Sequence, residues 1–167
     1  MAFILADQRM AGDATTLLAK YQEYLQSLRS QFPPKAFSVA TADWYHDVSD
    51  HRCPHDAWLE GLNVRESGIG PRTATRSVQL TLRLLGAYHD GHLEFHYTDV
   101  TAYRCELVEN GAPGHADWRY GESRLSKGGR VLHEIEWWNR DRTGTWLIEA
   151  ADIDLRWIPF VDSRRGA

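Results

Sequence analysis

The segment from residue 78 to residue 97 constrains the fold of this chain more than any other part of the sequence. Apolar and polar residues alternate over 78–84 and again over 93–97, which is the period-two pattern of half-buried β-strands. Asp90-Gly91 lies between these runs and is typical of a two-residue hairpin turn. The segment therefore predicts an antiparallel β-hairpin.

The predicted register can be tested for consistency with burial. If Asp90-Gly91 forms the whole loop, Leu84 lies opposite Tyr97, and the apolar side chains of both strands share one face of the sheet. We expect this face to be buried in the core. Its predicted core residues are Leu80, Leu82, Leu84, Phe95 and Tyr97.

One amphipathic helix is predicted near the N-terminus, over residues 14–31. Asp13 can cap its first turn, and Pro33-Pro34 is expected to end it. Apolar residues spaced three and four apart form one stripe along it: Leu17, Leu18, Tyr21, Tyr24, Leu25, Leu28 and Phe32. Residues 35–56 follow without a clear period, and we expect an irregular loop there.

The remaining sequence, about 56–160, is rich in strand patterns. The predicted strands cover 58–64, the two arms of the 78–97 hairpin, 103–108, 118–125, 131–138, 145–150 and 153–158. We expect a single α+β domain over residues 1–167, with the helix packed on a mostly antiparallel sheet or sandwich of about seven strands.

Charge and composition exclude several classes of protein. The net charge is −4 and no stretch concentrates Lys or Arg, so we expect no nucleic-acid partner. No apolar run approaches the roughly 20 residues that span a bilayer, and the apolar N-terminal run is too short for a signal peptide. Two cysteines are too few for a disulfide framework. These features predict a cytoplasmic protein with no membrane partner.

A group of titratable residues near the hairpin tip is the first candidate site. His89, His92 and Glu94 lie opposite the apolar face, and His92 and Glu94 are roughly 7 Å apart along the strand. They could ligate a metal ion, whereas His96 is too far from His92 to join. The alternative is that these residues form the solvated face of an amphipathic hairpin, and we favour it.

A second histidine cluster lies in the irregular 35–56 segment. His46, His51, Cys53 and His55 occur within ten residues. Their spacing matches no usual structural zinc pattern, and no second ligand pair follows downstream. We therefore favour a surface loop over a zinc site, and we expect no bound metal and no cofactor.

A third candidate lies in the second predicted hairpin. With Gly128-Gly129 as its turn, His133 lies opposite Arg124 and Ile135 lies opposite Glu122. His133 and Glu122 then share one otherwise apolar face of the hairpin. Glu122 and His133 could act as an acid–base pair. They could equally form an ion-paired group at the margin of the core, which we favour. Motifs of serine hydrolases, phosphate-binding loops and dinucleotide-binding folds are absent from the sequence.

The order of several short motifs resembles that of small uncharacterised bacterial β-rich domains, some of which occur as immunity proteins beside polymorphic toxins. The likeness spans about residues 55–157 and leaves the helix outside it. It is carried by His55-Asp56-Ala57-Trp58-Leu59, Leu80–Leu84, Leu93-Glu94-Phe95, Val100–Tyr103, Asp117–Glu122 and Gly129–Ile135. The resemblance implies a binding protein and gives no catalytic residues.

We expect a domain that binds another protein and is not an enzyme, with toxin neutralisation as one setting. The oligomeric state is left open by the sequence. Aromatic anchors dominate many interfaces, and a mixture of apolar and titratable groups is typical of them. The predicted interface residues are Trp44, Tyr45, Trp58, His89, His92 and Glu94. The alternatives are a metal- or small-ligand-binding domain that uses the histidines, and an aromatic-lined sugar or base pocket built from the seven tryptophans.

Overall fold

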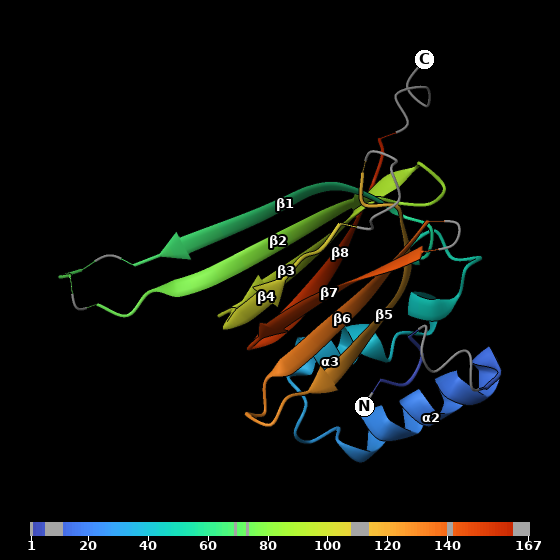
Figure 1. Ribbon diagram of the computed structural model, residues 1–167, viewed down its shortest axis with the longest axis horizontal. Coiled ribbons are helices and arrows are strands. Elements are labelled where there is room, and N and C mark those ends of the chain that lie inside the picture. The colour runs from blue at the N-terminus through green and yellow to red at the C-terminus, as the bar shows by residue number, and fades with distance from the viewer. Residues whose placement is uncertain are drawn as a thin grey trace.

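The chain folds into two N-terminal helices and one open, antiparallel, eight-stranded sheet, as Figure 1 shows. The computed structural model describes residues 2–5, 12–68, 70–72, 74–107, 114–139 and 142–161. The predicted α+β class is confirmed. The strands form a single sheet in the order β4-β7-β6-β5-β1-β2-β3-β8. Their bounds are β1 Trp58–Ser67, β2 Ser77–Leu85, β3 Gly91–Thr98, β4 Ala102–Arg104, β5 Asp117–Leu125, β6 Val131–Asn139, β7 Arg142–Ala150 and β8 Asp152–Pro159.

The helical region differs from the prediction. Helix α2 (Ala14–Ser27) begins where expected, because the Asp13 carboxylate accepts a hydrogen bond from Thr16 N at 3.0 Å, but it ends before residue 31. Pro33-Pro34 does not end this helix. Pro34 instead begins a second one, α3 (Pro34–Ala40), because proline lacks only an N–H that the first turn leaves unpaired. A 3₁₀ turn, η1 (Asp43–His46), follows, so the 35–56 segment is largely ordered.

The core lies between the two halves of the curved sheet. Phe95 of β3 stacks on Trp118 of β5 with ring centroids 5.2 Å apart, which brings the inner faces of the two halves into contact. The leucines and aromatic residues predicted for the β2–β3 face are buried, with 0–1% of their surface exposed, which confirms that prediction. The other predicted strands occur as well, although the one expected over 103–108 is only Ala102–Arg104, and residue 108 lies outside the described residues.

The tight turn at Asp90-Gly91 was a wrong prediction. Leu84 pairs with Leu93, and Leu80 rather than Leu84 pairs with Tyr97. The register is shifted by four residues, because Gly86 N donates to Gly91 O at 3.0 Å and closes the hairpin around a four-residue loop, 87–90. A shift by an even number of residues leaves every side chain on its predicted face, so burial alone could not reveal the error.

Tertiary packing explains the longer loop. The Trp157 ring of β8 lies directly over Gly86 and Gly91, and a Cβ atom placed on Gly91 would lie 2.5 Å from it. Phe160 N also donates to Asp90 O at 2.7 Å, so Asp90 belongs to the contact with β8 and not to a free turn. His89 accommodates the chain reversal with a positive φ of 55°.

The second hairpin is also longer than predicted, by one residue. Ser126 N donates to Arg130 O at 2.8 Å, and His133 pairs with Ser123 instead of Arg124. An odd shift exchanges the two faces of one strand relative to the other. Glu122 and His133 are therefore on opposite faces of the sheet, and the acid–base pair proposed from the sequence is not formed.

Strands β1 and β5 separate soon after they meet, which leaves one edge of β5 open to the helices. Their only pairing within the described residues is Trp58 with Asp117. Tyr21 of α2 closes this edge, because its hydroxyl accepts from Ser123 N at 2.6 Å and donates to Ser123 O at 3.0 Å. Unpaired edge groups thus find partners in a helix side chain. No helix in the described part of the chain is long and apolar enough to cross a membrane.

Candidate functional site

One row of side chains on the outer face of the sheet contains two of the sequence-predicted site residues, Trp58 and His92. Trp58, Leu85, His92 and Ile158 are consecutive partners across β1, β2, β3 and β8. Directly paired residues of antiparallel strands point to the same face. This row lies at the end of the sheet that carries the 86–91 loop.

Large apolar side chains are exposed in and beside this row. Trp58 is 51% exposed, and its ring meets His89 edge-on with centroids 4.6 Å apart. Phe160 is 46% exposed and packs against His92 at 4.7 Å. We call this patch the aromatic end surface. Its members are Trp58, Tyr88, His89, His92, Ile158 and Phe160.

The 48–51 segment fixes one side of the aromatic end surface. His51 stacks on Tyr88 with centroids 4.1 Å apart, and its Nδ1 lies 2.5 Å from Asp90 Oδ2. The Tyr88 hydroxyl donates to Val48 O at 3.0 Å. These contacts join two segments that are about forty residues apart in sequence, so Tyr88 is held in place although it is exposed.

A cluster of charged residues borders the aromatic end surface along the outer face. The Arg83 guanidinium lies 3.2 Å from Glu60, 2.7 Å from Glu94 and 2.9 Å from His92 Nδ1. His92 Nε2 in turn lies 3.0 Å from Glu60 Oε2. Arg83 was absent from the sequence-based candidates because the predicted register placed it opposite residue 98, whereas in the structure it faces Glu94.

Two of the three metal ligands proposed from the sequence belong to this cluster. His92 and Glu94 are neighbours, as predicted, but the Arg83 cation occupies the space between them. His89 does not join them, because it lies in the loop against Trp58. Among the residues that the structure describes, no group of three or more His, Cys, Asp or Glu side chains could hold a metal ion.

Two of the predicted interface aromatics lie elsewhere. Tyr45 is 3% exposed and belongs to the core, so it is not available as a surface anchor, which corrects its assignment from the sequence. Trp44 is half-buried and covered by Arg52, whose guanidinium lies 5.1 Å from the ring centroid. Neither ring therefore extends the aromatic end surface.

The role of Tyr45 is to complete a buried polar network that the sequence did not predict. The His133 ring is 1% exposed and lies between two tyrosine hydroxyls, with Tyr97 Oη 2.8 Å from Nδ1 and Tyr45 Oη 3.2 Å from Nε2. A neutral imidazole has one donor and one acceptor, which matches two hydroxyl partners. Burial lowers the pKa of His133 to about 3, so the ring is neutral at pH 7.

Glu122 lies on the opposite face and is fully buried there. It accepts hydrogen bonds from Phe3 N and Ile4 N, both at 2.9 Å, and its Oε1 lies 2.9 Å from Arg124 Nε. Burial raises the pKa of Glu122, and these partners oppose that change. The carboxylate therefore anchors the N-terminal segment to β5, which is a structural role.

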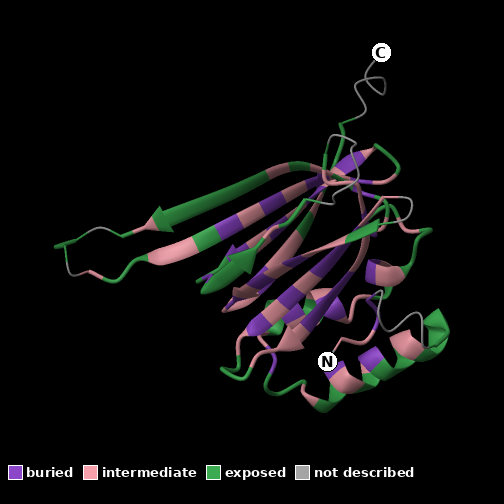
Figure 2. Ribbon diagram, in the orientation of Figure 1, coloured by how far each residue is buried: buried purple, intermediate pink, exposed green. Residues whose placement is uncertain are grey.

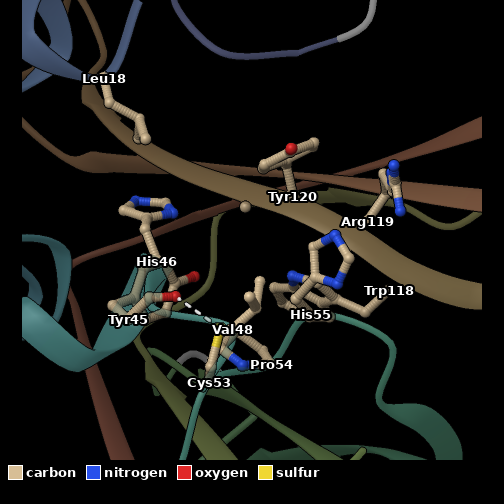
Figure 3. A pocket seen from close by; sticks show the side chains of 11 residues that line it. Leu18, Tyr45, His46, Val48, Cys53, Pro54, His55, Trp118, Arg119 and Tyr120 are labelled. Carbon is tan, nitrogen blue, oxygen red and sulfur yellow. Dashed lines mark hydrogen bonds between the residues drawn. The ribbon is translucent and has the colours of Figure 1, made fainter. Parts of the chain in front are cut away.

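A small pocket opens where β1 and β5 separate, and Figure 3 shows the side chains around it. Its volume is about 70 Å³, far below the roughly 300–1,000 Å³ of most small-molecule sites. The pocket is too small for the sugar or base considered from the sequence. Its lining residues are Leu18, Tyr45, His46, Val48, Cys53, Pro54, His55, Trp118, Arg119, Tyr120 and Gly121.

The groups in this pocket are poorly suited to nucleophilic chemistry. The Cys53 thiol donates to Tyr45 O at 3.3 Å, and burial raises its pKa to about 11, so little thiolate exists at pH 7. Burial lowers the pKa of His46 to about 4. The three large tryptophans Trp118, Trp137 and Trp146 are core residues and do not line a larger ligand site.

Comparison with known proteins gives no further assignment. No protein-family model, no curated protein and no solved structure matches this chain.

Proposed function

We propose that this chain is a protein-binding domain that contacts its partner through the aromatic end surface. The observation that carries the proposal is the exposure of Trp58, Tyr88 and Phe160, each about half accessible, in one patch at one end of the sheet. Large exposed apolar patches rimmed by polar residues are typical of interaction sites.

The composition of the patch also supports this proposal. Aromatic residues are enriched at the centres of interfaces, and charged residues gather at their rims. Here Trp58 and Phe160 lie in the patch, while the Arg83–Glu60–Glu94 cluster borders it. Both carboxylates of the cluster lie within ion-pair distance of Arg83, so the cluster can lie at the rim of a contact without leaving an unpaired charge.

Toxin immunity is the most specific form of the proposal. It rests on the resemblance of residues 55–157 to small uncharacterised bacterial β-rich domains, some of which occur as immunity proteins. The net charge of −4 also favours a basic partner such as a nuclease toxin. An immunity protein neutralises its toxin by binding it, which requires a surface rather than an active site.

The experiment replaces Tyr88 by a photo-crosslinking amino acid in bacterial cells that contain the partner. Irradiation should produce one discrete adduct, whose protein component mass spectrometry identifies. The matched control carries the same group at Tyr103, which is 51% exposed on the distant strand β4. The same adduct from both positions would contradict a contact localised at the aromatic end surface.

Once the partner is identified, calorimetry should locate the binding energy. Trp58→Ala is expected to weaken binding by about 2 kcal/mol, or roughly thirtyfold, as truncation of an aromatic anchor does. Tyr103→Ala should leave the affinity unchanged. If the partner is a toxin, only the Trp58→Ala variant should lose protection of cells that express it. Equal affinities for the two variants would exclude Trp58 from the interface.

A further inference from the structure

The outer edge of β1 has no partner strand over most of its length within the described residues. After its single pair with β5 at Trp58, β1 continues to Ser67 with β2 as its only partner within the described residues. Figure 1 shows the β1–β2 hairpin projecting from the body, with no other described element beside β1. Figure 2 shows the projecting part of β1 as exposed along most of its length.

The backbone groups available on this edge follow from the register. Gly86 N donates to Gly91 O, so the even-numbered residues of β2 bond to β3 and its odd-numbered residues bond to β1. On β1 the odd-numbered residues from Gly61 to Ser67 are opposite those odd-numbered partners. The N–H and C=O groups of Leu62, Val64 and Glu66 therefore point to the free edge.

Two apolar side chains accompany these free groups. Leu62 pairs with Leu82 and Val64 pairs with Leu80, so both point to the same face as the buried core. Leu62 and Val64 nevertheless remain 37% and 40% exposed, because no described strand pairs with this part of β1 on the side away from β2. An edge with unpaired backbone groups and exposed apolar side chains is a template for another strand.

We propose that this edge pairs with the same edge of a second copy of the chain, in an antiparallel dimer whose two-fold axis passes between the two Asn63 residues. This register places Leu62 of each copy opposite Val64 of the other, on the core-facing side. Both residues direct their backbone groups to the free edge, so the apolar contacts and the backbone hydrogen bonds are satisfied together. The inference concerns a surface distinct from the aromatic end surface and is independent of the proposed function.

The alternative registers are less complementary. An axis centred on Val64 would place Leu62 opposite Glu66, an apolar side chain against a charged one. In the Asn63-centred register, Arg65 lies opposite Gly61 of the other copy, beside Glu60 on the outer face, where the charges are opposite. The irregularity between Leu59 and Gly61 ends the regular part of the strand.

The geometry of the hairpin also favours a closed dimer. Because the paired strands run in opposite directions, the two bodies lie at opposite ends of the paired hairpins. The contact is isologous, so it uses the β1 edge of both copies and cannot grow further.

Sedimentation velocity tests the dimer with the complete chain. Between about 1 and about 200 µM, a range that brackets weak interfaces, the mass should rise from one chain to two. Val64→Lys should raise the dimer dissociation constant more than about tenfold, because each substitution acts twice in a symmetric contact. Tyr103→Lys, on the edge strand β4, is the matched control and should dimerise normally. A monomer at every concentration, or growth beyond two chains, would overturn the proposal.

Disulfide trapping tests the register in a Cys105→Ser background, which leaves only the buried Cys53. In the proposed dimer Asn63 lies opposite Asn63 of the other copy as a non-hydrogen-bonded pair. The two Cα atoms are then about 4.5 Å apart, which suits a disulfide. Asn63→Cys should therefore give a cross-linked dimer under mild oxidation. Arg65 is exposed, as Asn63 is, but in this register it faces Gly61 of the other copy. Arg65→Cys should therefore cross-link several times more slowly. Equal rates for the two variants would refute the register.

Discussion

The buried histidine network makes a quantitative prediction about stability and pH. His133 lies between the hydroxyls of Tyr45 and Tyr97 and is almost completely excluded from solvent. Its pKa is lowered from 6.5 to about 3 in the folded protein by burial. The folded state therefore keeps the ring neutral under conditions in which the unfolded chain takes up a proton.

The sign and size of the effect follow from that difference. Below pH 6.5 the unfolded state binds one more proton than the folded state at this residue, so stability falls as the pH decreases. Relative to pH 8, His133 should reduce the free energy of unfolding by about 1 kcal/mol at about pH 5.5 and by about 3 kcal/mol at about pH 4.5. The loss should level off near pH 3, where the folded ring also protonates.

Urea unfolding followed by tryptophan fluorescence measures this dependence, because Trp118 lies beside the His133 ring at 5.8 Å. His133→Gln keeps a donor and an acceptor but does not titrate. It should be less stable at pH 8 and should lack the loss of about 3 kcal/mol between pH 8 and about pH 4.5. His89→Gln, which removes an exposed histidine, is the control. Parallel pH profiles for the wild type and His133→Gln would refute the assignment of the effect to this network.

Three further substitutions test the fold. Leu82→Ala should lower the free energy of unfolding by about 2–5 kcal/mol in urea titrations, because Leu82 is fully buried, and a loss below 1 kcal/mol would place it outside the core. Tyr21→Phe should cost about 1–3 kcal/mol, because both backbone groups of Ser123 lose their partner; unchanged stability would show that water replaces the hydroxyl. Gly91→Ala should cost about 1–3 kcal/mol by forcing a Cβ atom against the Trp157 ring, and an unchanged melting temperature would contradict the close approach.

Local sequence patterns were sufficient to predict a helix or a strand where a single periodicity or a capping residue defines it. The alternation over 78–84 identified β2 and its buried leucines, and the Asp13 cap located the start of α2. The end of α2 and the start of α3 were missed, because Pro33-Pro34 is compatible both with ending one helix and with beginning another.

The predicted binding residues show the same limit. Trp58 lies beside His89 and in the same row as His92, because β1 pairs with β2 at Leu85 and β2 pairs there with β3. Phe160 and Ile158 were missed, because they reach the patch only through the pairing of β8 with β3. Tyr45 was placed at the surface because nothing in the irregular 35–56 segment indicates that it reaches His133.

The sequence by itself determined which faces of the strands are apolar, because side-chain alternation is a local property of each strand. Strand register and the partners of buried polar groups were decided only by the tertiary structure. The β2–β3 loop is set by Trp157, which packs on Gly86 and Gly91 from a strand more than sixty residues away. One extra residue in the β5–β6 loop separates Glu122 from His133, because an odd change of register exchanges the two faces of a strand.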